Sequence, residues 1–147
     1  NSAIYGAMGA GALIAALTIA FNNSQRWRAA RLLAGEAAFI AGLMGIGFVA
    51  TAWQAIALVA LLGWGSVTQL ATMNTLVQTQ VPNDLRGRVV SIYLWALQGI
   101  APIGSLLIGW MTQTRTLPLT ALICGSICLL GIGFIQLFHP DVRRTVA

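Results

Sequence analysis

The chain has 147 residues, of which 58% are hydrophobic and only 7% charged, and its formal net charge is +5. A soluble domain carries about 25% charged residues, so this composition excludes an ordinary soluble globular protein. Residues 37–83 contain no charged side chain at all. As one helix this stretch would be roughly 70 Å long, more than twice the ~30 Å of a bilayer's hydrocarbon core. It therefore predicts two membrane crossings joined by a turn.

Five membrane spans are predicted along the chain, at about 3–21, 32–50, 54–80, 89–111 and 117–138, followed by a tail at 139–147. Each is apolar and long enough for one crossing of about 20 residues. A backbone inside hydrocarbon must satisfy its own hydrogen bonds, and no span alternates polar and apolar residues as a barrel strand does. The fold class is therefore an all-α membrane protein in which residues 1–147 form one bundle. The third span is long, and we expect it to be tilted.

Small residues recur every four positions in three of these spans. They are Ala3, Ala7, Gly11 and Ala15 in the first, Ala34, Ala38 and Gly42 in the second, and Ala101, Ser105 and Gly109 in the fourth. Small residues allow close approach of helix backbones in a bilayer. We interpret them as packing positions within the bundle, with a dimerisation face as the alternative.

Glu36 is the only acidic residue well inside the edge of a span, about one turn into the second. A carboxylate at membrane depth suggests a proton site by default. Because Arg31 is near in sequence, we favour an interfacial or paired glutamate and keep proton carriage as the alternative.

Polar residues gather on the third and fourth spans. Thr68, Thr72, Thr75 and Thr79 follow helical spacing, with Gln69, Asn74 and Gln78 beside that line, and the fourth span has a mixed face of Ser91, Trp95, Gln98, Pro102 and Ser105. Polar groups at membrane depth usually face the bundle interior, where they either join helices or line a water-filled pathway. Both interpretations stay open, and the pathway would be lined by Gln69, Thr72, Asn74, Tyr93, Trp95 and Gln98.

The segment between the third and fourth spans is the most specific in the chain. Pro82 cannot continue a helical hydrogen-bond ladder, and Asn83 or Asp84 can cap the helix that follows. Arg86 and Arg88 then lie at the membrane surface, where Asp84 or lipid phosphate can pair with them. The segment is either a charged turn that fixes topology or a gating latch between moving helices.

Arginines give the orientation. Arg26, Arg28, Arg31, Arg86, Arg88, Arg143 and Arg144 fall on one side of the predicted spans, and Arg115 alone falls on the other. This asymmetry predicts a cytoplasmic C-terminus and an external N-terminus. The arginines are scattered over loops, which argues against a nucleic-acid partner. A first residue other than methionine, leading straight into an apolar span, suggests the C-terminal part of a larger protein.

Catalytic or metal-binding residues are sparse. The chain has three acids, one histidine and no lysine, and they are far apart in sequence. Cys124 and Cys128 share a face of an apolar span, where buried cysteine is usually an inert packing residue. His139 is expected to be an interfacial residue just beyond the last span. We therefore expect no enzyme, no metal and no cofactor in this chain.

The run Pro82, Asn83, Asp84, Leu85, Arg86, Gly87 and Arg88, followed by a helix with Pro102, Gly104, Ser105 and Gly109, resembles the major facilitator superfamily. The stretch 74–78 is similar to its enterobactin-exporter-like and multidrug-efflux branch. This resemblance implies a twelve-helix transporter of which the chain forms helices eight to twelve. The chain would pack against the first seven helices of the same protein. The first, third and fourth spans would then face the cavity. Loop 22–28 has arginines but lacks the glycine and aspartate of the family's loop signature.

The resemblance also implies an activity. It is that of an efflux permease in the bacterial inner membrane, a proton-coupled antiporter that exports a small molecule by alternating access. Two alternatives remain: a non-transporting scaffold or sensor subunit, and a membrane enzyme whose active residues lie elsewhere.

Overall fold

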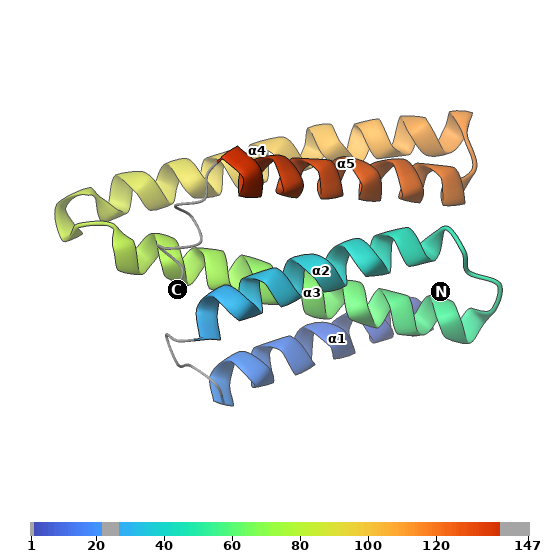
Figure 1. Ribbon diagram of the computed structural model, residues 1–147, viewed down its shortest axis with the longest axis horizontal. Coiled ribbons are helices and arrows are strands. Elements are labelled where there is room, and N and C mark those ends of the chain that lie inside the picture. The colour runs from blue at the N-terminus through green and yellow to red at the C-terminus, as the bar shows by residue number, and fades with distance from the viewer. Residues whose placement is uncertain (1, 22–26, 139–147) are drawn as a thin grey trace.

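Five helices make up the protein. The computed structural model describes residues 2–21 and 27–138, and all regular structure in them is helical (Figure 1). The helices are α1 (Ser2–Phe21), α2 (Arg28–Ile46), α3 (Ala52–Gln80), α4 (Asn83–Thr114) and α5 (Leu117–Phe138). Each is long and apolar enough to cross a membrane. The predicted all-α class with five spanning helices is thus confirmed.

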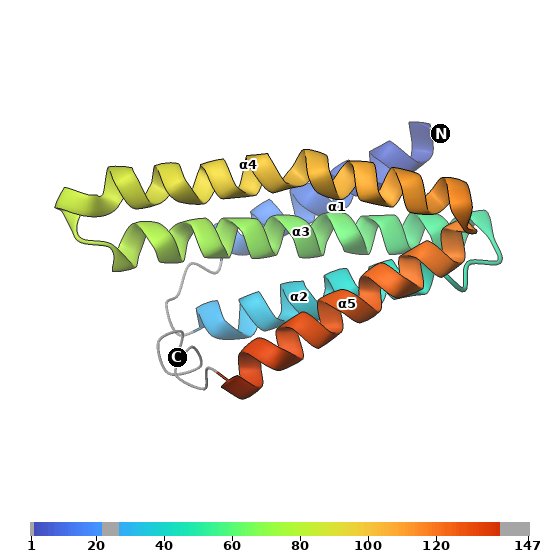
Figure 2. The ribbon, with the colours of Figure 1, turned by 90° about the horizontal axis from the view of Figure 1, so that it is seen from above.

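Successive helices run in opposite directions, so the helix ends collect at two ends of the molecule. Figures 1 and 2 show the end of α1, the start of α2 and the α3–α4 turn at one end. The α2–α3 and α4–α5 turns lie at the other. The main packing joins α3 to α1 and α2, and α5 lies against α2.

The α2–α3 turn begins earlier than the sequence predicted. We expected the second span at 32–50, whereas α2 ends at Ile46 and α3 begins after Thr51. The Thr51 side chain accepts a bond from the backbone N–H of Gln54, and the Gln54 side chain accepts one from the backbone N–H of Thr51. This reciprocal cap fixes the start of α3. Sequence hydropathy missed it because residues 47–50 are apolar.

The α3–α4 turn also differs from expectation in its cap. Helix α3 ends at Gln80, as Pro82 predicted, but Asn83 and Asp84 do not cap α4. Pro82 occupies the capping position, and its carbonyl accepts bonds from the backbone N–H groups of Leu85 and Arg86. Asp84 lies inside the first turn, where a negative charge is still favourable.

Backbone-to-backbone contact holds α1 against α3. The buried residues of α1 are Ala7, Gly11 and Ala15, three of the four small residues predicted to pack. A Cβ added at Gly11 would overlap the carbonyl oxygen of Ala60, and one added at Gly63 would overlap that of Met8. Glycine at both positions is what permits this close approach.

Helix α2 approaches α3 in the same manner. Its buried residues are Gly35 and Gly42, and a Cβ added at Gly65 would lie 2.8 Å from the carbonyl oxygen of Gly35. The predicted stripe in this span is therefore only partly correct, because Ala34 is exposed and Gly35 takes its place. A shift of one residue on a helix turns the contact face by 100°, which spacing alone did not resolve.

Helix α4 stands apart from this packing. None of its residues is buried, and it meets α3 and α5 only weakly. Its predicted packing stripe does not pack here: Ala101 and Ser105 are exposed and Gly109 is half-buried. Trp95 is 84% exposed.

Candidate functional site

The threonine line of α3 bonds mainly to its own helix. The hydroxyl of Thr72 donates to the carbonyl of Thr68 at 2.7 Å, and that of Thr75 donates to the carbonyl of Ala71 at 2.8 Å. Thr79 donates to the carbonyl of Thr75 at 2.8 Å. Thr68 is 1% exposed and its hydroxyl has no partner. The packing interpretation thus accounts for the hydroxyl protons of Thr72, Thr75 and Thr79 but not for that of Thr68, and the pathway interpretation stays a prediction.

The amide groups of α3 become more exposed towards the C-terminal end of that helix. Gln69 is half-buried, whereas Asn74 and Gln78 are exposed. The Nε2 group of Gln78 donates to Oδ1 of Asn74 at 3.0 Å. Asn74 is therefore already engaged with a neighbour one turn along its helix.

The polar face of α4 is open along its middle. Trp95 and Gln98 are both exposed, and Tyr93, one of the predicted pathway residues, is half-buried. Pro102 lies inside the helix and has no N–H, so the backbone carbonyl of Gln98, four residues earlier, loses its helical partner. An indole ring, a side-chain amide and a freed carbonyl thus lie close together on one helix.

The predicted pathway residues lie on two helices and differ in how far they are exposed. Thr72 is buried against α1 and α2, whereas Trp95 and Gln98 project from the uncovered helix α4. Gln69 and Asn74 lie on α3, with different exposure. Trp95 and Gln98 are exposed together on α4, and their role in a pathway stays a prediction.

The charged residues of the α3–α4 turn are exposed at the end of the molecule. Asp84, Arg86 and Arg88 all lie in the first two turns of α4. Their position agrees with a membrane-surface turn and leaves the gating interpretation a prediction. Arg26, His139, Arg143 and Arg144, which entered the sequence analysis, lie outside the described residues.

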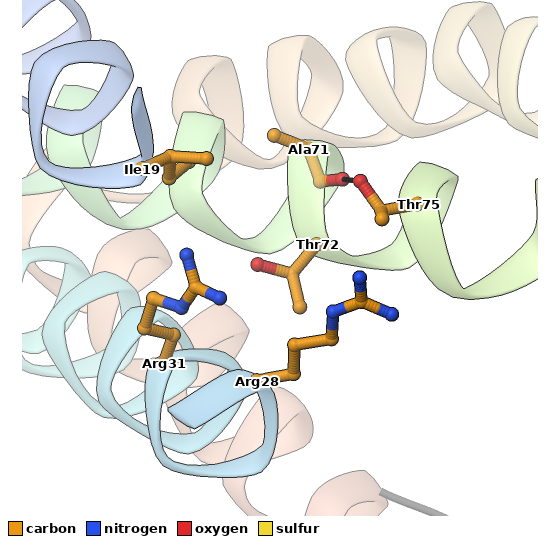
Figure 3. A pocket seen from close by; sticks show the side chains of 6 residues that line it. All are labelled: Ile19, Arg28, Arg31, Ala71, Thr72 and Thr75. Carbon is orange, nitrogen blue, oxygen red and sulfur yellow. Dashed lines mark hydrogen bonds between the residues drawn. The ribbon is translucent and has the colours of Figure 1, made fainter. Parts of the chain in front are cut away.

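A small hollow between α1, α2 and α3 was not anticipated. Figure 3 shows the guanidinium groups of Arg28 and Arg31 on either side of Thr72, with Ile19 of α1 and Thr75 of α3 beside them. The free space is about 20 Å³. From the sequence we used Arg28 only to predict topology, and Arg31 to predict topology and as the neighbour of Glu36. The available signal was their spacing of three, which places both on one face of a helical turn.

A larger hollow lies at the opposite end, where α4 turns into α5. Its volume is about 780 Å³, and Trp110, Arg115 and Leu119 are among its lining residues. Arg115 is the one arginine that the sequence analysis assigned to the outer side.

The part of the chain that the structure describes has few side chains that could bind a metal or take part in redox chemistry. No group of three or more histidine, cysteine, aspartate or glutamate side chains occurs there. Cys124 and Cys128 are free thiols, both half-buried on α5.

Comparison with known proteins gives a family. The model of a family described as transmembrane secretion effector, of the major facilitator superfamily, matches residues 2–145. Neither a curated protein nor a solved structure matches the chain. The match covers all five helices and implies a transporter rather than an enzyme. With its five apolar helices, this multi-pass membrane protein belongs to the transmembrane secretion effector family of the major facilitator superfamily.

Proposed function

We propose that the protein is a secondary-active efflux permease that exports a small molecule by alternating access. The family match over residues 2–145 is the observation that carries this proposal, because it covers the whole helical bundle. The enterobactin-exporter-like and multidrug-efflux branch, inferred from residues 74–109, is part of the same proposal.

The middle of α4 supports a ligand-contact role. Trp95 offers an aromatic face for stacking, Gln98 offers both amide donors and an acceptor, and Pro102 frees one further carbonyl. Transporter sites typically lie near the bilayer midplane at broken or distorted helices. We propose that α4 faces the transport pathway, and that further helices of the same protein form its other wall.

The arginine distribution supports a cytoplasmic C-terminus. Arg28 and Arg31 open α2, and Arg86 and Arg88 lie in the first turns of α4, at the same end of the bundle. Positively charged loops are retained on the cytoplasmic side. We place the protein in a bacterial inner membrane, with the lipid bilayer and a small-molecule substrate as its partners and no nucleic acid.

Accessibility of α4 tests the pathway. In the full-length protein with Cys124 and Cys128 replaced by serine, Gln98→Cys and Gln69→Cys are treated with a water-soluble thiol reagent. Ile100→Cys is the matched control, since it lies on the opposite face of α4. Labelling of Gln98→Cys with an unlabelled control supports a solvated pathway. Equal protection of all three would instead favour the non-transporting scaffold or sensor.

Transport itself is tested with an amphipathic dye. Cells that express the full-length protein should lose preloaded ethidium faster than empty cells. Trp95→Ala and Gln98→Ala should slow that loss at equal expression, whereas Ile100→Ala should not. If the full-length protein changes the loss of neither ethidium nor any of a panel of amphipathic compounds, the efflux proposal fails.

Proton coupling is tested at Glu36. This residue is half-buried on α2, beside Gly35 in the contact with α3. We propose that Glu36 is an interfacial residue and that the coupling acid lies in another part of the protein. Glu36→Gln should therefore leave the pH dependence of dye efflux unchanged. Loss of that dependence would instead assign proton carriage to Glu36.

A further inference from the structure

The hollow between α4 and α5 joins a charged rim to an apolar wall. It opens at the turn between Thr114 and Thr116, and its volume of about 780 Å³ is comparable with sites for drug-sized ligands, which measure roughly 300–1,000 Å³. Below the turn its wall is formed by Met111 of α4 and by Leu119 and Ile123 of α5. Figure 2 shows that the two helices diverge from their shared turn, because α5 leaves α4 and lies against α2.

Among the residues that the structure describes, Arg115 is the only charged one that lines this hollow. Its backbone N–H donates to the carbonyl of Met111 at 2.8 Å, and its side chain is exposed. Within residues 2–21 and 27–138 its guanidinium has neither a hydrogen bond nor an ion pair. The described carboxylates are remote from it, since Asp84 lies at the opposite end of α4 and Glu36 lies in the first half of α2, whose start shares that end. The positive charge at the rim can therefore attract an anion.

Two further donors lie at the same rim. The Thr116 hydroxyl and the Trp110 indole N–H line the hollow and have no partner among the described residues. The Thr114 hydroxyl instead shares its proton between the carbonyls of Trp110 and Met111, both at 3.2 Å, and turns only lone pairs outwards. Trp110 is 65% exposed one turn inside the end of α4, the level at which indole rings collect in membrane proteins. The hollow thus has donors at headgroup depth above an apolar wall.

From this arrangement we propose that the hollow binds one anionic phospholipid, with its phosphate against Arg115 and an acyl chain along Leu119 and Ile123. An arginine presents a fork of donors that matches two phosphate oxygens. An apolar wall alone would accept any lipid, and a cation alone would accept any soluble anion. Together they favour a molecule that has both parts, and the charge of Arg115 selects the anionic class. In the orientation proposed above, this site lies at the outer leaflet.

The charge is tested with the full-length protein, purified in detergent and stripped of lipid. Native mass spectrometry measures the affinity for the first added phosphatidylglycerol and for phosphatidylcholine, whose headgroup has no net charge. We expect Arg115→Gln to lower phosphatidylglycerol affinity by about tenfold, as the loss of a charge-assisted bond implies, and to abolish its preference over phosphatidylcholine. Arg88→Gln is the control, because it removes the same charge from an exposed position at the other end of α4, and it should retain that preference.

Two results of this experiment would overturn the proposal. Equal losses in Arg115→Gln and Arg88→Gln would reduce the effect to general surface charge. A wild-type protein without a preference for phosphatidylglycerol would show that the hollow does not select an anionic lipid. Because both side chains are exposed, neither substitution should change the thermal unfolding midpoint measured without added lipid.

The apolar wall is tested by a matched pair of leucines on α5. Leu119 lines the hollow and is 47% exposed, whereas Leu129 is not among the lining residues and is 50% exposed. Leu119→Ser should lower phosphatidylglycerol affinity several-fold, because the acyl chain then covers less apolar surface. Leu129→Ser makes the same chemical change and should leave that affinity unchanged. Equal affinities in the two variants would contradict an acyl chain in the hollow.

Glycerol phosphate separates a lipid from a soluble anion, since it carries the phosphate group without acyl chains. It is added to the wild-type protein with bound phosphatidylglycerol, and sodium chloride of equal ionic strength is the control. We expect glycerol phosphate to displace no more lipid than the chloride does. Displacement by glycerol phosphate that is lost in Arg115→Gln would assign the hollow to a soluble phosphate ester and refute the lipid.

Discussion

At position 63 the lack of a side chain sets the distance between two helices. A Cβ on Gly63 would overlap the carbonyl oxygen of Met8, a backbone atom that cannot rotate away. Gly63→Ala should therefore separate α1 from α3 and lower the free energy of unfolding by about 1–3 kcal/mol, as overpacking does. Thermal unfolding of the full-length protein in detergent measures this.

Gly99→Ala is the matched control for this substitution. Nothing lies within 4 Å of a Cβ added at Gly99 on α4, so alanine should leave stability unchanged or raise it through its better helix propensity. A similar loss at both positions would mean that the close approach of α1 and α3 does not limit stability.

For Thr68, unlike Gly63, we expect a substitution that does not lower stability. Its hydroxyl is buried without a partner, so Thr68→Val, which keeps the shape, should leave stability unchanged or raise it by up to about 1 kcal/mol. Thr72→Val removes the bond to the Thr68 carbonyl and should lower stability by about 0.5–1 kcal/mol. Thermal unfolding in one detergent, without urea, compares the stability of the two variants. A greater loss of stability for Thr68→Val than for Thr72→Val would contradict the conclusion that the Thr68 hydroxyl is unpaired.

Among the elements, α4 has a backbone carbonyl, that of Gln98, that lacks a helical partner because of Pro102. Pro102→Ala restores an N–H for the carbonyl of Gln98, and a proline inside a helix generally costs about 3 kcal/mol. We expect the protein to become no less stable and its ethidium efflux to slow, because the freed carbonyl is lost. Efflux rate at matched expression is the measurement.

Pro118→Ala provides the control for the proline. Pro118 lies in the first turn of α5, where N–H groups have no helical partner, so its replacement changes no hydrogen bond. Wild-type efflux is expected. Efflux of Pro102→Ala at the wild-type rate would remove the carbonyl of Gln98 from the proposed contact surface.

Sequence patterns predicted well which segments are helices, but they predicted poorly which helices pack against each other. The end of α3 followed from Pro82, and Ala7, Gly11 and Ala15 were predicted to pack, because proline chemistry and residue size act locally. The choice of Gly35 over Ala34, and the exposure of Ala101, depend on which helix lies opposite. That information is tertiary, and spacing within one span does not contain it.

The candidate site was likewise only partly visible in the sequence. Trp95 and Gln98 were predicted because a mixed polar face in an apolar span is conspicuous, and their role stays a prediction. The hollow at Arg28 and Arg31 escaped because it needs α1 and α3 to be placed beside the start of α2. The charge of a loop is read from one segment at a time, whereas a hollow is lined by several segments.

At the scale of the whole molecule, the alternating helix directions make a prediction about sidedness. With native cysteines replaced, Arg115→Cys should react with an impermeant thiol reagent applied to intact cells. Arg88→Cys should react only after the cells are opened, because it lies at the other end of α4. Reaction of Arg88→Cys in intact cells would invert the orientation and place the C-terminus outside.

The interlocked backbones of α1 and α3 also restrict how the bundle can deform. At Gly11 and at Gly63, a backbone carbonyl of the opposing helix occupies the space that a side chain would fill. Sliding one helix along the other would therefore bring these carbonyls against larger residues. Packed surfaces of this kind have discrete arrangements rather than a continuum. During a transport cycle α1 and α3 would therefore move together as one rigid body. Bending would fall on α4, whose ladder is already interrupted at Pro102.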